Sequence, residues 1–410
     1  MYIYIGTGEL IQLRILHITP SYIPAYRYGG PIYSVHALCR SLAAAGHDVH
    51  VLTTSVDGSC DSIVPYDRPV ELDGVRVHYC RSRWMRRLYW STDLKARCAA
   101  MVAGFDAVHL HSVFLFPTWA GARAADRAGI PYVLSPRGML VRDLITQRSS
   151  AIKNMWIRLI ERRNLAQAAR IHLTSREEYR SLADLGLALA PTIVIPNGVD
   201  APLPSPSDDV SADVRAMILE GFDILSFGRI NWKKGLDWLI KSVVEMPDAT
   251  ALIAGHDEDG LAVQLKALAE ECGVRDRVRF LPRQITGADK EALFGAARLF
   301  VLPSLSENFG NVVAEAMIRG LPVVVTAGVG AAEIVRASGG GVIAPSTPQA
   351  FAAAVADLLE SNERLAAMGR AGAAYARERL SWDTIASQFE ELYSDISGRS
   401  GHRSHQPAAA

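Results

Sequence analysis

Short hydrophobic runs alternate with longer amphipathic stretches along most of this chain. Leu299–Leu302 and Val323–Thr326 are two such runs, and uninterrupted apolar runs of this length are typical of strands buried on both faces of a parallel sheet. Polar loops and segments of helical periodicity lie between them. The alternation predicts an α/β protein built from doubly wound parallel sheets.

One proline-rich segment interrupts this alternation near the middle of the chain. Residues 201–209 read APLPSPSDD, a composition typical of a linker. Because 410 residues exceed the size at which a single core stops growing, we expect two Rossmann-like domains. They are predicted over residues 1–202, with 1–13 as an extension, and over 203–380. A last helix follows over 381–397, and a disordered tail over 398–410.

The stretch from Leu299 to Val325 carries the first candidate chemistry. Its polar loop contains Glu307, and Gly310 and Asn311 then open a helix with Glu315 in about its first turn. Loops at the carboxyl ends of parallel strands form the ligand crevice of such sheets. The start of a helix there directs N–H groups at an anion. The alternative is that Glu315 only complements the helix dipole and that Glu307 is a solvated loop residue.

An earlier loop offers cations at the same edge of the predicted sheet. Residues 228–235, GRINWKKG, follow the strand predicted over Asp223–Phe227 and supply Arg229 and either Lys233 or Lys234. Charge-assisted hydrogen bonds from such side chains would hold a diphosphate, although the spacing is not that of a Walker loop. A plain surface loop is the alternative. In a later strand-to-helix loop, Arg283 is placed to border a nucleobase.

The first half of the chain repeats the pattern of strand followed by crevice loop. Gly29 and Gly30 follow the strand predicted over Arg14–Thr19, where a phosphate or sugar could approach the backbone. A tight turn that requires glycine is the alternative. His111 ends another strand and could bond a sugar hydroxyl. The alternative is a structural histidine whose hydrogen bonds are made within the protein. Arg137 lies in the loop after the strand beginning at Tyr132.

The stretch from Arg76 to Arg97 combines arginine with tryptophan and tyrosine. Its cations face a single acid within the stretch, Asp93, and this mixture suits the headgroup layer of an anionic membrane. A solvated basic surface is the alternative. The whole chain has 43 Lys and Arg against 43 Asp and Glu, so its net charge gives no general attraction to nucleic acid.

Composition and cysteine usage indicate a soluble protein of a reducing compartment. Hydrophobic residues make up 49% and charged residues 21% of the chain, which is typical of globular proteins. The five cysteines lack metal-type spacing. Residues 1–10 contain no Lys or Arg, unlike a signal peptide, and no apolar run reaches the ~18 residues of a membrane span. We therefore expect a cytoplasmic protein with at most peripheral membrane contact.

Taken together, these motifs resemble a known family. The order Gly228-Arg229, Lys234-Gly235 and then Glu307-x7-Glu315 is similar to the donor site of retaining glycosyltransferases of family 4, which have the GT-B fold. The resemblance covers roughly residues 14–396. It includes Gly29-Gly30, the strand ending in His111, and residues 195–200, IPNGVD. Residues 135–139, SPRGM, resemble bacterial members that build polysaccharides.

The resemblance implies two Rossmann-like domains that face each other across a cleft, with the last helix crossing back to the first domain. Arg229 and Lys234 would grip the donor diphosphate, and Glu315 would bond the ribose. The donor sugar would be held by Glu307 and by backbone groups of Phe309, Gly310 and Asn311. From the first domain, Gly29, Gly30 and His111 would reach the donor, with Arg137 on the acceptor side and Arg283 near the base. Catalysis would fall to Arg229, Lys234, Glu307 and His111, without a metal or cofactor.

The implied reaction moves a sugar from a UDP- or GDP-sugar to a glycan acceptor, expected to be lipid-linked, in polysaccharide synthesis. A covalent glutamate is not expected, because eight helical residues span ~12 Å, whereas a retaining glycosidase pair needs about 5–5.5 Å. The nucleoside diphosphate would depart and the acceptor would attack from the same face. The alternatives are another enzyme of this fold, such as a nucleotide-sugar epimerase or a phosphorylase, or a non-catalytic sugar-binding protein.

Overall fold

The chain folds into two compact units, which a computed structural model describes over residues 12–141, 150–203, 209–257 and 259–399. Unit 1 contains residues 1–173, 181–195 and 385–410, and unit 2 contains residues 174–180 and 196–384. Three predicted segments lie partly outside the described residues: 1–11 of the extension predicted over 1–13, 204–208 of the linker, and 400–410 of the tail predicted over 398–410.

Unit 1 is built on an eight-stranded sheet with the order β10-β9-β8-β7-β1-β2-β6-β5. All neighbouring strands are parallel except β5, which runs antiparallel to β6. Its strands are β1 (Arg14–Ile18), β2 (Asp48–Thr54), β5 (Val70–Leu72), β6 (Val75–Cys80), β7 (Ala107–His111), β8 (Tyr132–Ser135), β9 (Arg170–Leu173) and β10 (Thr192–Val194). A separate two-stranded ribbon consists of β3 (Val56–Asp57) and β4 (Cys60–Asp61).

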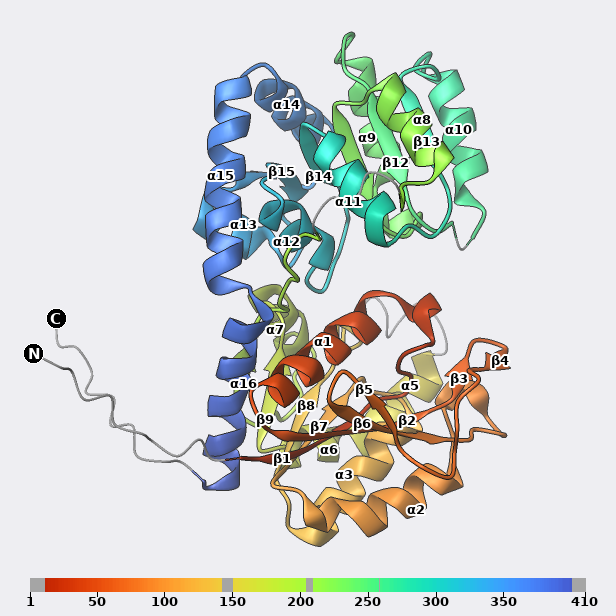
Figure 1. The fold of residues 1–410 in the computed structure, drawn as a ribbon, viewed down its shortest axis with the longest axis vertical. Coiled ribbons are helices and arrows are strands. Elements are labelled where there is room, and N and C mark those ends of the chain that lie inside the picture. The colour runs from red at the N-terminus through yellow and green to blue at the C-terminus, as the bar shows by residue number, and fades with distance from the viewer. Residues whose placement is uncertain (1–11, 142–149, 204–208, 258, 400–410) are drawn as a thin grey trace, which may run out of the picture. The chain divides into compact units, whose positions relative to one another are not determined.

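The helices of the first half follow the strands in the alternation that the sequence predicts (Figure 1). They are α1 (Gly30–Ala44), α2 (Thr92–Met101), α3 (Phe116–Ala128), α5 (Ser150–Trp156), α6 (Arg162–Gln167) and α7 (Arg176–Ala183). Residues 150–167 form one helical stretch that consists of α5, a π-helical turn over Ile157–Glu161, and α6. Sequence periodicity does not distinguish so short a π turn from regular helix, because it inserts into the helix without interrupting it.

Unit 2 has a six-stranded, fully parallel sheet with the order β13-β12-β11-β14-β15-β16. Its strands are β11 (Ile224–Phe227), β12 (Ala251–Ala254), β13 (Val278–Leu281), β14 (Leu299–Leu302), β15 (Val323–Thr326) and β16 (Gly341–Ala344). The helices of the second half are α8 (Ala212–Glu220), α9 (Leu236–Val244), α10 (Leu261–Glu271), α11 (Gly287–Ala296), α12 (Asn311–Ile318), α13 (Ala332–Ser338), α14 (Pro348–Leu359), α15 (Asn362–Arg379) and α16 (Trp382–Ser397).

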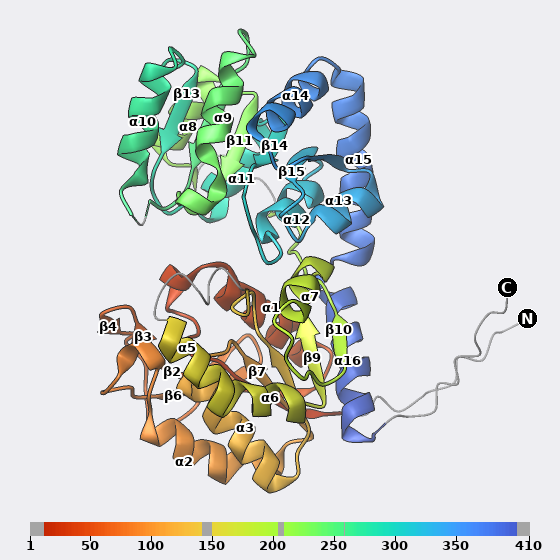
Figure 2. The same ribbon diagram turned by 180° about the vertical axis from the view of Figure 1, so that it is seen from behind.

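Helices lie on both faces of the unit 2 sheet (Figure 2). A hydrophobic cluster packs against each of these faces. Phe300 and Leu302 of β14 belong to one cluster, whereas Leu299 and Val301 belong to the other. Successive side chains of a strand point to opposite faces, and because both faces are covered, every residue of β14 is buried. The α/β prediction of doubly wound parallel sheets is therefore confirmed, and the observed bounds of β14 and β15 are those expected from the sequence.

The last helix, α16, packs within unit 1 over most of its length. Phe389 and Tyr393 are buried there, and Tyr393 Oη lies 2.6 Å from His109 Nδ1 of β7. Arg170 of β9 donates to Asp395 at 2.8 Å. Among the described residues, none of the helices is both long and apolar enough to cross a membrane.

Loops at the carboxyl ends of the unit 2 strands pack backbone against backbone at two glycines. Gly255, after β12, has φ +139°, and a Cβ atom there would overlap the carbonyl of Gly228, after β11. The N–H of Gly228 donates to the carbonyl of Ala254 at 3.0 Å. Glycine at 255 lets these two strand ends approach each other directly, and glycine at 228 accommodates a φ of +134°.

We predict that Gly255→Ala lowers the free energy of unfolding by about 3 kcal/mol, because it adds a clash to an unfavourable backbone conformation. Gly221→Ala is the matched control: Gly221 also has positive φ, +75°, but a Cβ atom there meets nothing within 4 Å. That change should cost only about 1–2 kcal/mol. Urea unfolding of the two variants measures the difference, and equal losses would contradict the packing argument.

Candidate functional site

The loops after β11 and β14 bring two predicted site residues into direct contact. Lys234 Nζ lies 2.6 Å from Glu307 Oε1, and the two side chains are 16% and 22% exposed. Ser304 Oγ donates to the same carboxylate oxygen at 3.2 Å. Because β11 and β14 are parallel neighbours, their carboxyl ends meet at one edge of the sheet, as the sequence predicts.

Glycine and backbone hydrogen bonds set the position of Lys234. The N–H of Leu305 donates to the carbonyl of Lys233 at 2.9 Å, which ties the two loops together. Gly235 has φ +59°, and a Cβ atom there would overlap the carbonyl of Pro303. The two glycines of the sequence motif thus have different reasons: Gly235 allows close packing against the loop after β14, whereas Gly228 has φ +134°, a backbone conformation that favours glycine. Arg229 is on the same loop and is solvent-exposed.

The backbone of Glu307 is fixed by the loop that follows β15. Its N–H donates to the carbonyl of Gly328 at 3.1 Å, and its carbonyl accepts from the N–H of Gly330 at 3.0 Å. Glu307 and Val329 form a parallel β-bridge. The carboxylate therefore extends from a backbone that is hydrogen-bonded on both sides, which restricts where it can reach.

Helix α12 begins directly after this loop. Its N-cap, Gly310, has φ +90° and no side chain to occupy the first N–H groups of the helix, so this end can bind an anion. Phe309 is 3% exposed, so it can offer a ligand only backbone groups. The Oδ1 atom of Asn311 accepts from Asn197 Nδ2 at 2.8 Å, so this side chain already has a partner within unit 2.

Glu315 lies further along α12 than expected. The helix starts at Asn311, and Glu315 is its fifth residue, directly after a first turn that contains no acid, so Glu315 lies just beyond the turn in which it was expected. The carboxylate of Glu315 pairs with Lys290 Nζ of α11 at 2.9 Å. Lys290 also lies 5.9 Å from the ring centroid of Phe227. Sequence reasoning missed this lysine, because nothing in its local pattern distinguishes it from other charged helix residues.

Arg283 is engaged by two carboxylates rather than presented alone. It donates to Asp213 of α8 at 2.7 Å and to Asp289 of α11 at 2.8 Å. The hydrogen bond from Arg283 holds the pKa of Asp213 well below its usual range, and these bonds raise the pKa of Arg283. This network ties the first turns of two helices together. A role of Arg283 near a nucleobase stays a prediction. Its structural role is to link α8 and α11 through Asp213 and Asp289.

In unit 1, the glycine pair opens α1 as expected. Gly29 is the N-cap residue with φ +68°, and its N–H donates to the carbonyl of Tyr26 at 3.0 Å. The turn therefore requires glycine. A Cβ atom at Gly29 would meet nothing within 4 Å, so the backbone there is also open to a ligand, and both interpretations are compatible with the structure.

A chain of hydrogen bonds crosses the sheet of unit 1 through two buried histidines. Tyr393, His109, Ser135, His172 and the carbonyl of Ile195 follow one another at 2.6, 2.7, 2.7 and 2.9 Å. The carbonyl can only accept, so His172 Nε2 carries the proton, and each preceding donor follows. Tyr393 thus donates to His109 Nδ1, His109 Nε2 to Ser135, and Ser135 to His172 Nδ1.

His111 belongs to a second buried chain. Arg137 Nη2 donates to His111 Nδ1 at 3.3 Å, and His111 Nε2 lies 3.0 Å from His17 Nδ1. Since arginine only donates, His111 Nε2 must donate to His17. His111 is 1% exposed, and both of its ring nitrogens have protein partners. Its predicted contact with a sugar therefore stays a prediction. The structure supports the alternative, a structural histidine whose two ring nitrogens are both hydrogen-bonded within the protein.

The histidines are buried without a compensating acid. Burial, followed by the nearby charge of Arg137, lowers the pKa of His17 to about 3, and the same two causes lower the pKa of His172 to about 3. Burial also lowers the pKa of His109 and His111 well below the usual value. These side chains are therefore neutral at physiological pH.

Among the described residues, His17, His109 and His111 are the group that could hold a metal ion, with ligand atoms within 4.8 Å of one another. The nearest ring nitrogens of His17 and His111, Nδ1 and Nε2, lie 3.0 Å apart, which is a hydrogen-bond distance. His109 and His111 already use both ring nitrogens. The cation of Arg137 would also repel a metal, so the geometry favours a hydrogen-bonded network.

In the structure, ion pairs with acids from other parts of the chain neutralise some of the cations of residues 76–97. Arg76 pairs with Asp48 at 2.9 Å and Arg86 with Asp61 at 2.9 Å. Asp93 is the single acid within the stretch, but acids on strands outside it also pair with these cations. What remains open is an apolar tip: Trp84 and Met85 are 78% and 60% exposed.

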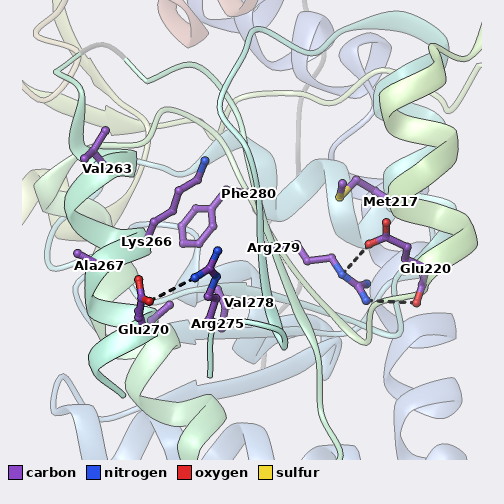
Figure 3. A pocket seen from close by; sticks show the side chains of 11 residues that line it. Met217, Glu220, Val263, Lys266, Ala267, Glu270, Arg275, Val278, Arg279 and Phe280 are labelled. Atoms are coloured by element: carbon purple, nitrogen blue, oxygen red, sulfur yellow. Dashed lines mark hydrogen bonds and ion pairs between the residues drawn. The ribbon is translucent and has the colours of Figure 1, made fainter. Parts of the chain in front are cut away.

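A hollow of about 560 Å³ lies along the edge strand β13 between α8 and α10, away from the predicted site (Figure 3). Val263, Lys266 and Phe280 are among its lining residues. Two arginines in it are already paired, Arg275 with Glu270 and Arg279 with Glu220. None of the residues predicted from the sequence lines it, and it lies at the side of the sheet rather than at the carboxyl ends of the strands.

Comparison with known proteins gives two family matches that follow each other along the chain. The model of the glycosyl transferase 4-like domain matches residues 29–198, and that of glycosyl transferases group 1 matches residues 216–375. A D-inositol 3-phosphate glycosyltransferase of Xylanimonas cellulosilytica is 28% identical, covering 96% of this chain and 98% of its own length. One of Mycobacterium avium is 30% identical, covering 92% and 87%.

Solved structures show the same fold. The HepE protein of Anabaena in complex with UDP and glucose has a TM-score of 0.72 and 23% identity, with 94% of this chain and 100% of that chain covered. A sucrose-phosphate synthase of Thermosynechococcus elongatus has a TM-score of 0.73 and 23% identity, with 95% and 100% covered.

We predict that acid destabilises unit 1 through the buried histidines. Their pKa values are lowered in the folded state, so protons favour the unfolded chain as pH falls below its histidine pKa of about 6.5. Each of His17 and His172 should cost about 1.4 kcal/mol of unfolding free energy per pH unit, from about pH 6.5 down to about 3. Stability measured by urea unfolding at several pH values gives the slope.

Replacing one histidine measures its contribution to the pH dependence of the unfolding free energy. His17→Asn should reduce the pH dependence by about one histidine's contribution, whereas His256→Asn, at an exposed position, should leave it unchanged. A wild-type stability that stays flat between pH 7 and 5 would show that the histidines are not buried as neutral groups.

Proposed function

Because this chain belongs to the glycosyl transferases group 1 family, whose members use nucleotide sugars, we propose that it transfers a sugar from a nucleoside-diphosphate sugar with retention of anomeric configuration. The observation that carries the proposal is the pair of Lys234 with Glu307 at 2.6 Å, next in sequence to the open N-terminus of α12. A cation, a carboxylate and a helix dipole at one sheet edge suit a diphosphate joined to a sugar.

In the proposed mechanism, the diphosphate takes the place of Glu307 at Lys234. Lys234 and Arg229 then stabilise the negative charge that develops as the bond between the sugar carbon and the phosphate oxygen breaks. Glu307, released from the lysine, accepts a hydrogen bond from the donor sugar. The acceptor hydroxyl attacks from the face of the departing diphosphate, and its proton passes to that leaving group. Side-chain cations supply the positive charge, so we propose that no metal or organic cofactor takes part.

Glu315 is proposed to bind the ribose of the donor. Lys290 contacts one of its carboxylate oxygens, Oε2. A carboxylate offers about four acceptor positions, so it can still accept from a ribose hydroxyl pair. We propose UDP-sugars as the first donors to test, because the similar HepE structures contain UDP, or UDP-glucose, with GDP-sugars as comparators.

The proposed acceptor is a lipid-linked glycan of polysaccharide synthesis. The observation that supports it is the exposed tip of Trp84 and Met85, together with the exposed cations Arg83 and Arg87. Aromatic and basic side chains in this combination bind the headgroup layer, so we propose peripheral contact with the cytoplasmic face of a membrane. Small phosphorylated polyols form a second acceptor class, which the names of the related D-inositol 3-phosphate enzymes support.

Two other activities of this fold are separated by simple measurements. A phosphorylase would carry pyridoxal phosphate, so an absorbance scan of the pure protein tests for it. An epimerase would convert the nucleotide sugar without releasing it, whereas a transferase releases UDP or GDP. A sugar-binding protein would bind the donor without turnover.

We predict that Lys234→Met weakens UDP binding and donor turnover by about ten- to a hundredfold, since it removes a charge-assisted bond worth about 1.5–3 kcal/mol. Lys233→Met is the matched control, because Lys233 lies against Trp232 instead of Glu307. Calorimetric titration with UDP and release of UDP from UDP-glucose measure the effects. Equal loss in both variants would remove the assignment of Lys234 to the diphosphate.

We also predict salt-sensitive binding to vesicles that contain phosphatidylglycerol. Trp84→Ser with Met85→Ser should weaken this binding at least about tenfold, and Arg83→Gln should weaken it about fivefold at low salt. Leu219→Ser is the control, since Leu219 is 87% exposed in unit 2. Binding that ignores both lipid charge and salt would contradict membrane contact through this tip.

A further inference from the structure

The loop that carries Glu307 is attached to the start of helix α7 by the side chain that follows the glutamate. Asn308 Nδ2 donates to Thr174 Oγ1 at 2.8 Å, and Ser175 Oγ donates to the carbonyl of Asn308 at 2.8 Å. These partners are 134 and 133 residues apart in sequence. All three residues belong to unit 2, because residues 174–180 pack with that unit.

A buried carboxylate sets the direction of these hydrogen bonds. Glu178 is 6% exposed and accepts from both the N–H and the hydroxyl of Thr174, at 2.8 and 3.0 Å. Thr174 has one hydroxyl proton, which it gives to Glu178, so its oxygen must accept from Asn308. The orientation of the Asn308 amide is therefore determined, with its nitrogen facing Thr174.

The backbone bond from Ser175 is equally constrained. Ser175 Oγ accepts from the N–H of Glu178 at 3.1 Å, as an N-cap does, so its proton is free to go to Asn308. Gly330 packs against this bond: a Cβ atom there would overlap the carbonyl of Asn308 and lie 2.7 Å from Ser175 Oγ. The same Gly330 donates its N–H to the carbonyl of Glu307.

We propose that Asn308 is a positioning residue: its amide, held by Thr174, fixes the backbone from which Glu307 and the N-terminus of α12 reach the donor sugar. The inference rests on the proposed function. Asn308 does not itself need to touch substrate. Its Oδ1 atom is buried and has no hydrogen-bond partner among the described residues, so the bond to Thr174 is the one that orients the side chain.

The test uses Asn308→Asp in the full-length protein, a change that keeps the size of the side chain but replaces its donor by a carboxylate. At pH 8 the new carboxylate would face Thr174 Oγ1 and lie near Glu178, with no proton to give. We expect kcat for UDP release from UDP-glucose to fall about a hundredfold, with KM changed by less than about threefold. Asn362→Asp, where Asn362 Oδ1 accepts from Arg298 on the other side of unit 2, should leave both parameters unchanged.

A pH profile separates positioning from loss of folding. Once protonated, the carboxyl group introduced by Asn308→Asp can again donate to Thr174, so the ratio of variant to wild-type kcat should rise as pH falls from 8 to 6. Thr174→Val removes the acceptor and should give a similar loss of kcat but a ratio that does not change with pH. The melting temperature of each variant shows whether it is folded over this range.

The outcomes distinguish the two proposals. If the wild-type protein neither binds UDP nor turns over UDP-glucose or the other nucleotide sugars, the proposed function fails. If the wild type is active and folded Asn308→Asp matches it at pH 8, or if its loss does not depend on pH, the positioning role of Asn308 is overturned while the proposed function stands.

Discussion

The pairing of Lys234 with Glu307 depends on one constraint, the parallel alignment of β11 with β14. Residues Ile224 and Leu225 lie beside Leu299 and Phe300 in this register, so the loop after each strand emerges at the same edge. Side chains that are distant in sequence then meet without any long connection. Backbone must also approach backbone there, which explains glycine at 235 and 255.

The proposed mechanism requires a diphosphate to displace Glu307 from Lys234, and relative interaction strengths favour this exchange. Both side chains are partly exposed, and ion pairs at such positions contribute only about 1 kcal/mol or less. A diphosphate offers several charge-assisted hydrogen bonds of about 1.5–3 kcal/mol each. It can therefore displace the Glu307 carboxylate from Lys234, while in its absence neither the lysine nor the glutamate is left as an isolated charge in a half-buried crevice.

The sequence was sufficient for the parallel architecture and for the two loops that meet, because both follow from local hydrophobic patterning and from the topology of parallel sheets. The bounds of β14 and β15 and the proximity of Lys234 to Glu307 belong to this class. Lys290 beside Glu315, Arg86 beside Asp61, and Asn308 beside Thr174 do not. Each of these three contacts joins segments that are distant in sequence. Their relative position depends on packing angles and hydrogen-bond direction, which no local sequence pattern indicates. Glu315 lies just beyond the first turn of α12, although the helix starts at Asn311 as the sequence predicts.

Hydrogen-bond direction also explains how the chain is held where it leaves unit 1. The chain of donors from Tyr393 ends at the carbonyl of Ile195, the last residue of unit 1 before the chain enters unit 2. Two residues later, Asn197 donates to Asn311 at the start of α12. The carbonyl of Ile195 is held by a donor within unit 1, and the amide of Asn197 by an acceptor within unit 2. His109 and His172 therefore have a structural role within unit 1: through hydrogen bonds of fixed direction they link Tyr393 of α16 to the strands of the sheet and to the carbonyl of Ile195.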